Sequence, residues 1–111
     1  MALNAKTLAI RPALERRWAD ALGAFEASAE RGALGVDTRA DTVEELAELF
    51  RAHEVEPVTW YGVGLFVDWM DLAATEEVSA VAAVELQASR RDPYRQLSRV
   101  FHLMGHSRAN A

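Results

Sequence analysis

Several side chains that could bind a ligand gather in the segment RRDPYRQLSRVFHLMG, residues 90–105. Tyr94, Arg95 and Arg99 carry polar atoms near the point where a strand is expected to begin. Strand ends and the loops beside them are where α/β sheets usually place their binding sites. We therefore take these three side chains as candidates for ligand contact, whereas most of the segment is explained by folding, as a helix end and a buried strand.

Other residue patterns argue against common catalytic and metal sites. His102 and His106 are four residues apart on an expected strand, which separates them by about 13 Å, too far to share a metal ion. The GVG segment at 62–64 lacks the third glycine and the strand–turn–helix context of a dinucleotide loop, so close packing or a bulge within a strand is favoured. The chain has no cysteine and no GxSxG sequence, which leaves a thiolate nucleophile or a serine hydrolase without support.

Two features remain open between a structural and a functional interpretation. Glu85 lies in the apolar run AVAAVELQA, where a carboxylate needs a partner, and an ion pair, for example with Arg99, is favoured over an acid–base role. A subset of the arginines could form a local surface for RNA or phosphate, although solvated helix faces are the simpler interpretation. These arginines are Arg11, Arg16, Arg17, Arg90, Arg91, Arg95 and Arg99. The formal net charge of −5 does not attract a phosphate backbone to the chain as a whole.

The elements that must position these residues begin with a helix predicted within residues 5–30. Apolar residues recur there at spacings of four, four and three, which indicates one buried helical stripe. Pro12 fits a helix only in its first turn, so the main helix either begins near residue 11 or follows a short helix that kinks there. Glycines at 32 and 35 are expected to end the helix. The stripe consists of Leu14, Trp18, Leu22 and Phe25.

Two more helices and two strands are predicted after this loop. Thr42 and Glu45 form a capping-box pattern for a helix over residues 42–53. Residues 58–69 are apolar on both faces, which predicts an inner strand covered by helices on each side. A third helix is predicted over residues 75–91, with Thr75 as its cap and Asp92-Pro93 after its end. The closing strand is predicted over residues 97–104, again apolar on both faces.

The composition is that of one folded domain spanning residues 1–111. Half of the residues are hydrophobic, which provides enough apolar surface for a single core without disulfides. The tryptophans at 18, 60 and 69 and Tyr61 are expected in the core or at its rim. No stretch approaches the ~20 apolar residues that a membrane span needs, and residues 1–18 do not resemble a secretory signal. We therefore expect a cytoplasmic protein that has no membrane partner.

Four segments together resemble a known protein family. LNAKTLAIRPAL, VDTRADTVEELAELF, VTWYGVGLF and VELQASRRDPYRQLSRVFHL are similar, in that order, to the C-terminal half of class I S-adenosylmethionine-dependent methyltransferases, particularly the tRNA carboxymethoxyuridine methyltransferase family. The resemblance covers nearly the whole chain. Its most specific parts are Asn4-Ala5, which in the family follow the fifth strand, and a C-terminal pattern made by Glu85, Arg90, Pro93-Tyr94, Leu97, Arg99 and His102.

The resemblance implies an α/β fold that is the C-terminal part of a Rossmann-like methyltransferase, with about three helices and an antiparallel pair of long strands. In the family the last strand runs antiparallel between its neighbours. The implied activity is methyl transfer from S-adenosylmethionine, chiefly by positioning the two reactants in line. Asn4, Arg39, Tyr94 and Arg95 are the implied substrate-binding residues; no catalytic group and no metal ligand is assigned.

Two departures from the family change what is expected. The family's cofactor site needs a glycine-rich turn after the first strand and an acidic residue after the second, and the sequence contains neither. Gly64 stands where relatives carry an arginine that faces the substrate. We therefore expect a truncated fold that binds no S-adenosylmethionine alone, is inactive alone, and works as a homo-oligomer or with a separate cofactor-binding half. The alternative is a non-catalytic dimerisation or partner-binding module, because the missing strands would leave apolar helix faces and a sheet edge exposed.

Overall fold

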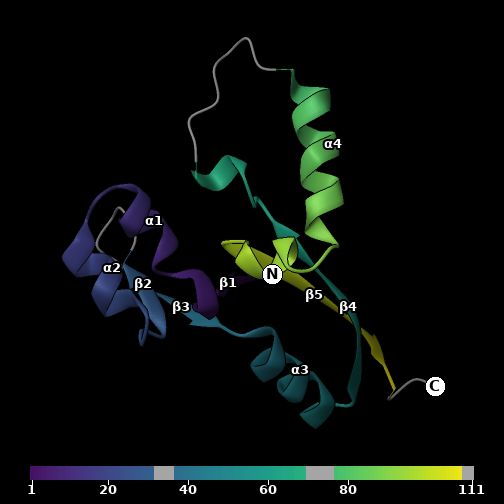
Figure 1. Ribbon diagram of the computed structural model, residues 1–111. Helices are drawn as coiled ribbons and strands as arrows, with labels where there is room; N and C mark the ends of the chain where they lie inside the picture. Colours follow the sequence, from purple (N-terminus) through teal and green to yellow (C-terminus); the bar gives the residue numbers. More distant parts are fainter. Residues whose placement is uncertain (32–36, 70–76, 109–111) are drawn as a thin grey trace.

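A computed structural model describes residues 1–31, 37–69 and 77–108 (Figure 1). Within this part of the chain, four α-helices and short 3-10 turns flank a mixed sheet of five strands. The strands are β1 (Ala2–Asn4), β2 (Ala29–Arg31), β3 (Asp37–Asp41), β4 (Val55–Val63) and β5 (Val100–Ser107). The helices are α1 (Ile10–Leu14), α2 (Trp18–Ala24), α3 (Val43–Ala52) and α4 (Val78–Ser89), with 3-10 turns η1 (Ala5–Thr7), η2 (Val67–Trp69) and η3 (Tyr94–Leu97).

The sheet has the strand order β2-β3-β1-β5-β4. β1 is parallel to β3 and antiparallel to β5, and β5 is antiparallel to β4 along a pairing that runs from Val55 opposite Ser107 to Val63 opposite Val100. The α/β class and the antiparallel pair of long strands are therefore confirmed. The three short strands β1, β2 and β3 were not predicted, because segments of three to five residues carry too little alternation to be recognised.

The prediction for residues 58–69 as one inner strand is wrong. β4 ends at Val63 and occupies the edge of the sheet, with Val58 67% exposed. The strand stops because Gly64 adopts a positive φ of 65°, so Gly64 lies past the strand end and not inside the strand. The apolar residues that follow it belong to a turn and to η2, where strand periodicity does not apply.

The core consists of two buried clusters, one around Leu3 and Leu8 and the other between α3 and one face of β5. Phe101 is fully buried and packs with Leu103 and with Ala47 of α3, while Trp60 of β4 packs against the edge of this cluster. The other face of β5 was expected to be covered too, but His102 and Met104 are exposed. The closing strand is thus buried on one face only. It begins at Val100, because residues 97–99, which were expected in the strand, lie in η3 and a short link before it.

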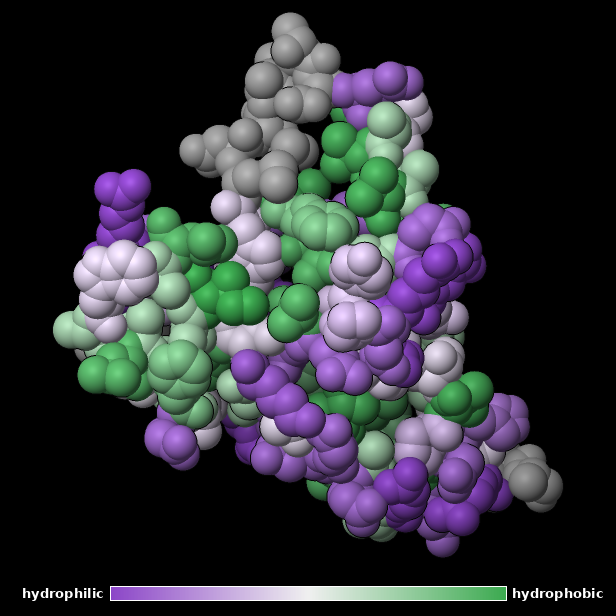
Figure 2. Space-filling model, viewed as in Figure 1, coloured by the Kyte–Doolittle hydropathy of each residue, from purple (hydrophilic) through white to green (hydrophobic). Residues whose placement is uncertain are grey.

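The prediction of a single helix near the N-terminus is also wrong. The segment forms η1, α1 and α2 in succession, and Arg16, with a φ of 61°, separates α1 from α2. The predicted stripe requires one continuous helix, so it does not form when the helix axis changes direction between α1 and α2. Pro12 lies in the first turn of α1, as its geometry requires. Leu14, Trp18, Leu22 and Phe25 are 60%, 66%, 75% and 71% exposed, and Figure 2 shows hydrophobic residues gathered over α1 and α2.

The ends of the other helices agree with the sequence. The Thr42 side chain accepts a hydrogen bond from the Glu45 backbone N–H at 3.0 Å, which is the expected cap of α3. His53 is the residue that follows α3, and α4 ends at Ser89, shortly before Asp92-Pro93. The proposed cap Thr75 and the glycines at 32 and 35 lie outside the described residues. None of the helices in the described ranges combines the length and apolar character that crossing a membrane would require.

Candidate functional site

Asn4 stands at the end of β1 and is held by three hydrogen bonds. Its Nδ2 donates to the carbonyl oxygens of Ser98 at 2.9 Å and Gln96 at 3.2 Å, and its Oδ1 accepts from the Lys6 backbone N–H at 3.0 Å. Only 4% of Asn4 is exposed. A buried amide with so many partners has one defined orientation, so Asn4 ties the end of β1 to the segment around η3.

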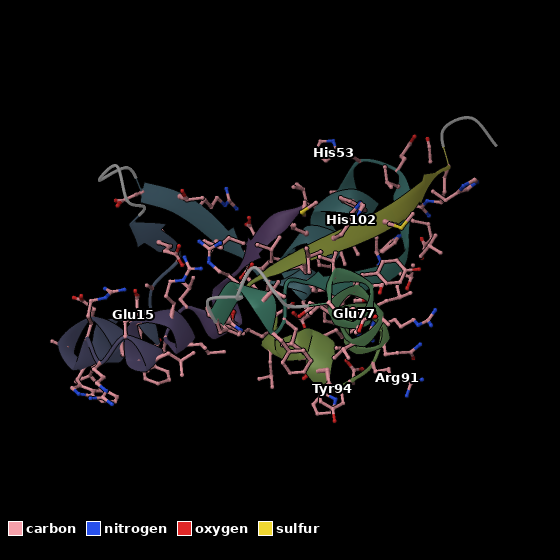
Figure 3. The ribbon with its side chains drawn as sticks, turned by 90° about the horizontal axis from the view of Figure 1, so that it is seen from above. Glu15, His53, Glu77, Arg91, Tyr94 and His102 are labelled. Carbon is pink, nitrogen blue, oxygen red and sulfur yellow. The ribbon has the colours of Figure 1, made fainter. Side chains whose placement is uncertain are left out.

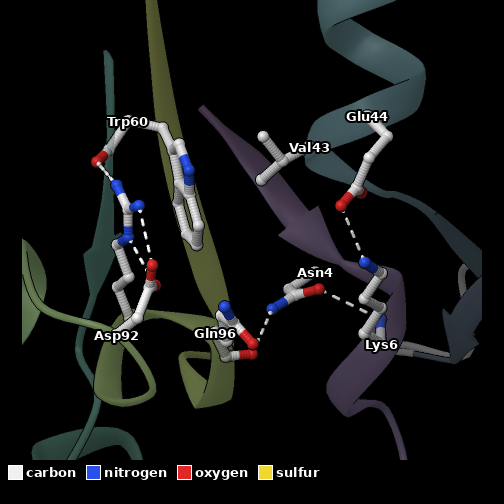
Figure 4. A pocket seen from close by; sticks show the side chains of 8 residues that line it. Asn4, Lys6, Val43, Glu44, Trp60, Asp92 and Gln96 are labelled. Atoms are coloured by element: carbon white, nitrogen blue, oxygen red, sulfur yellow. Dashed lines mark hydrogen bonds and ion pairs between the residues drawn. The ribbon is translucent and has the colours of Figure 1, made fainter.

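A cavity of about 330 Å³ opens beside Asn4 (Figure 4). Its walls come from β1, η1, α3, β4 and the segment that contains η3, elements that are far apart in the sequence. The sheet brings them together because β5 runs between β1 and β4. The lining residues are Asn4, Lys6, Val43, Glu44, Trp60, Asp92, Arg95 and Gln96.

Arg95 is the most firmly held charged residue of this cavity. Its guanidinium carbon lies 4.1 Å from the centroid of the Trp60 ring, and its Nη1 donates to the Trp60 carbonyl oxygen at 3.0 Å. Its Nε and Nη2 donate to the two carboxylate oxygens of Asp92 at 2.7 and 3.0 Å. The hydrogen bond with Arg95 lowers the pKa of Asp92 and the same bond raises the pKa of Arg95, so both stay charged at neutral pH.

A second ion pair lies across the cavity. Lys6 Nζ donates to Glu44 Oε1 at 2.9 Å, and this hydrogen bond lowers the pKa of Glu44. Both side chains are well exposed. The charged residues of the lining are therefore two cations and two anions, and each cation is paired with an anion.

The cavity brings together two of the four predicted substrate residues, Asn4 and Arg95. Arg39 lies on β3 with its side chain 81% exposed and pairs with Asp41 at 2.9 Å. Tyr94 begins η3 but lines a different and mainly apolar cavity of about 440 Å³, which Phe66, Val84 and Arg91 also line. Figure 3 shows Tyr94 and Arg91 on one side of the molecule, with His102 and His53 on the other.

Sequence reasoning missed the other residues of the cavity. Trp60 was interpreted as packing, and it is indeed half-buried at the rim of the core, whereas Trp18 is exposed. Lys6, Glu44 and Asp92 carried no signal of their own, because each is an ordinary charged residue near a helix or turn. Only the tertiary contacts, such as the Lys6 and Glu44 pair across 38 positions, make them neighbours.

Glu85 and Arg99 do not form the ion pair that was considered. The Glu85 carboxylate accepts hydrogen bonds from the backbone N–H groups of Leu65 at 2.9 Å, Phe66 at 2.7 Å and Val67 at 3.1 Å. Arg99 instead donates to Glu30 at 2.6 Å. The turn after β4 leaves consecutive N–H groups without strand partners, and a carboxylate is a strong acceptor for such groups.

Gly62 and Gly64 both lie close against other parts of the chain. A Cβ on Gly62 would lie 2.7 Å from Ser98 Oγ and 2.9 Å from the Arg95 Cα, and one on Gly64 would lie 2.7 Å from the Asp68 carboxyl group. Close packing was the expected role of this pair. A Rossmann-type cofactor turn needs glycine backbone that is open to the cofactor at a strand-to-helix junction, and neither of these two glycines offers such a surface.

Several of the arginines considered for phosphate contact are occupied by the chain's own carboxylates. Arg17 pairs with Glu15 and Asp20, Arg95 with Asp92, and Arg99 with Glu30. Arg11 donates to the carbonyl oxygen of Asp68 and lies over Trp69. Within residues 1–31, 37–69 and 77–108, no three His, Asp or Glu side chains gather as metal ligands would.

Comparison with known proteins adds no relative. No protein-family model matches the sequence, and no curated protein matches it. The resemblance of the four segments to methyltransferases has no support from these comparisons.

Proposed function

We propose that this chain forms the substrate-side, C-terminal portion of an S-adenosylmethionine-dependent methyltransferase similar to the tRNA carboxymethoxyuridine branch. The observation that carries the proposal is the position of β5, antiparallel between β1 and β4. The resembled family has its last strand antiparallel between its neighbours. These strands would be the later ones of a larger Rossmann-like sheet. Because β3 and β2 continue the sheet beyond β1, further strands would join at the outer edge of β2 or of β4.

The cavity beside Asn4 supports the proposal at the level of residues. Asn4-Ala5 follow β1, as Asn-Ala follow the fifth strand in the resembled family, and Asn4 shares a cavity with Arg95. Asn4, Trp60 and Arg95 are each held by bonds or stacking within the chain. Their role would be to bind and orient the acceptor, because methyl transfer depends on aligning two reactants.

The proposal assigns the cofactor to another chain or segment, because the sequence lacks the glycine-rich turn and the acidic residue with which the resembled family binds it. The cofactor held by that half would supply the methyl group, and the present chain would supply the acceptor site. On its own the chain is expected to bind no S-adenosylmethionine and to be inactive.

A second candidate, from a different class, is a non-catalytic dimerisation or partner-binding module derived from the same fold. The exposed side chains of Leu14, Trp18, Leu22 and Phe25 favour it, because apolar side chains gathered on a surface and left uncovered are typical of an interface (Figure 2). α4 exposes a second apolar surface, since it is apolar along most of its length yet only Ala88 is buried. The two candidates differ in what covers this surface. In the first it is a cofactor-binding half, and in the second it is a partner that binds no cofactor.

The deciding experiment is purification of the native protein, through a tag on this chain, from its source. We expect the native assembly to bind S-adenosylmethionine saturably and to transfer its methyl group to tRNA, while the isolated chain does neither. Arg95→Lys should lower methyl transfer and leave cofactor binding unchanged, because a lysine cannot donate the same three planar bonds. Arg51→Lys is the matched control, since Arg51 makes only an exposed pair with Glu48 on α3.

Two results would contradict the proposal. A saturable one-to-one isotherm of the isolated chain with S-adenosylmethionine would mean that the division into two halves is wrong. A native assembly that binds no S-adenosylmethionine would favour the partner-binding module.

A further inference from the structure

We infer that two copies of this chain pair through α4, antiparallel about a two-fold axis at Val84, with Glu77 of each copy beside Arg91 of the other. The inference goes beyond both candidate functions, because it names the surface that pairs, the partner and the register. It is also independent of the acceptor site, since the groove that receives the second copy shares no lining residue with the cavity beside Asn4.

The helix α4 is apolar on more sides than the rest of the described chain covers. Its less exposed residues lie on one face of the helix, by their spacing. They are Val81, Glu85, Ala88 and Ser89. A helix that is apolar on all sides is normally buried on all sides. Most of the circumference of α4 therefore lacks a partner within the described residues.

An apolar groove of about 440 Å³ runs beside one of the uncovered faces of α4. Phe66 and Tyr94, from outside the helix, line it together with Val84 of α4. Val84 is 56% exposed and Tyr94 is 49% exposed, so both offer apolar surface to a neighbour. Figure 3 shows Tyr94 and Arg91 on the same side of the molecule. This groove face is the surface to which the second copy is assigned.

One row of residues follows this face from one end of α4 to the other. Its members recur at alternating spacings of three and four, which is the pattern of a seam between two helices. They are Glu77, Ala80, Val84, Gln87 and Arg91, and the last three line the groove. The small side chain of Ala80 lets a second helix approach closely.

The two ends of this row carry opposite charges that the described chain does not pair. Glu77, the exposed residue before α4, accepts a hydrogen bond from the Ser79 hydroxyl at 3.2 Å, and Arg91 donates to the neutral amide oxygen of Gln87 at 2.8 Å. Neither residue takes part in the ion pairs found among the described residues. Arg91 is also the one charged residue that lines the groove.

A second copy fits because the row is complementary to itself when it is reversed. Val84 lies midway between Glu77 and Arg91 in the sequence, so a two-fold axis at Val84 forms two identical ion pairs. The helix dipoles then oppose each other, which is also favourable. A parallel arrangement would instead place like charges together.

The size of the surface sets the expected strength of the pair. α4 has 12 residues and is therefore about 18 Å long. A single helix seam of this length, with the groove beside it, belongs to the smaller interfaces. We expect a dissociation constant in roughly the micromolar range.

The first test reverses the charges at the two ends of the row and follows the mass of the purified chain by analytical ultracentrifugation. Glu77→Arg alone and Arg91→Glu alone should each weaken self-association by about tenfold, because both ion pairs become repulsive. An equimolar mixture of these two variants should dimerise like the parent chain, since each ion pair then forms with reversed polarity. The double variant Glu77→Arg/Arg91→Glu should dimerise too. Its recovery cannot come from the helix dipole, which both changes oppose.

The second test compares two exposed apolar positions of α4. Val84→Asp should weaken association by more than about tenfold, because it places two carboxylates at the axis. Leu86→Asp is the matched control: Leu86 is also 56% exposed, but two residues turn a helix by about 200°, so it lies on the other side. Far-ultraviolet circular dichroism and urea unfolding should show that both variants keep the fold, since neither position is buried.

Three results would overturn the inference. The first is a parent chain that stays monomeric at roughly 0.2 mM, far above the expected dissociation constant. The second is a mixture of the two single charge variants that does not dimerise. The third is association that Val84→Asp leaves unchanged or that Leu86→Asp weakens equally.

The outcome is separable from that of the proposed function. A monomeric chain in a native assembly that transfers methyl groups removes this inference alone. A dimer with the expected charge dependence, in an assembly that binds no S-adenosylmethionine, keeps the inference and removes the methyltransferase.

Discussion

At the scale of single residues, Gly62 controls how the candidate site is assembled. β4 passes so close to η3 at this point that a Cβ would lie 2.7 Å from Ser98 Oγ and 2.9 Å from both the Cα and the carbonyl oxygen of Arg95. Ser98 is itself fully buried and donates to the Arg95 carbonyl oxygen. The absence of a side chain at position 62 therefore lets Arg95 reach the Trp60 ring.

Gly62→Ala should destabilise the chain by about 1–3 kcal/mol, because backbone atoms of Arg95 must move to admit the methyl group. The stack of Arg95 on Trp60 should loosen with it. Urea unfolding measures the first effect, and near-ultraviolet circular dichroism of the tryptophans measures the second. Gly23→Ala is the control: nothing lies within 4 Å of its added Cβ inside α2, so stability should stay equal or rise by up to about 1 kcal/mol. Equal effects of the two substitutions would contradict this account.

The sequence allowed part of this residue-scale description to be predicted. Close packing at Gly62 and the need of Glu85 for a partner followed from local patterns, but the partner turned out to be three backbone N–H groups and not Arg99. Asn4 was named through the family resemblance and Arg95 also from its place near an expected strand end, and the two do share a cavity. The pairing of Lys6 with Glu44 could not be predicted, because it depends on how α3 is placed against η1.

At the scale of elements, the Glu85 side chain links α4 to the turn after β4. Among its residues only Ala88 is buried, yet Glu85 reaches the turn after β4 and accepts from its consecutive N–H groups. This contact explains why a carboxylate persists in an apolar helix. It also holds the turn that follows Gly64 and leads into η2.

Glu85→Gln should lower the free energy of unfolding by about 1–3 kcal/mol, because one of the two acceptor oxygens becomes an NH₂ group that faces backbone donors. Amide hydrogen exchange at Leu65, Phe66 and Val67 should accelerate together. Glu48→Gln tests whether the effect is specific, since Glu48 makes an exposed pair with Arg51 and should change stability by less than about 0.5 kcal/mol. Exchange at residues 65–67 that is unchanged in Glu85→Gln would contradict the anchoring role.

Elements with clear local signals were predictable, and those defined by their surroundings were not. The Thr42 cap and the helix behind it were confirmed because capping depends on a few neighbouring residues. The N-terminal helix was wrong because its apolar spacing does not reveal the break at Arg16. The edge position of β4 was missed because apolar residues on both faces do not say which strands flank it.

At the scale of the whole molecule, large apolar side chains remain exposed on α1 and α2. Most of the surface of Leu14, Trp18, Leu22 and Phe25 has no cover within the described residues. The buried clusters lie elsewhere, around Leu3 and Leu8 and around Phe101. The buried clusters that stabilise the fold therefore do not include the exposed apolar side chains of α1 and α2.

Replacing both Leu22 and Phe25 by serine should reduce binding of a hydrophobic dye and any self-association, without a shift of the urea midpoint. The reason is that these side chains are already mostly in solvent, so little burial is lost. Dye fluorescence and light scattering follow the surface, and urea unfolding follows stability. Leu8→Ser, in the core, should instead cost several kcal/mol, about as much as other large-to-small core changes. A lower urea midpoint for the double variant would show that the stripe packs against the chain itself.

The pairing of β1 with β5 joins residues from opposite ends of the described chain, Ala2 opposite Phe101 and Leu3 opposite Val100. During synthesis on the ribosome, β1 emerges before the other strands and β5 emerges last. Because β5 lies between β1 and β4 in the folded sheet, this position stays empty until almost all of these residues have been translated. Until then the edges of β1 and β4 are unpaired, and long-range pairing of this kind forms slowly. The nascent chain should therefore depend on chaperones longer than a helical protein of the same length.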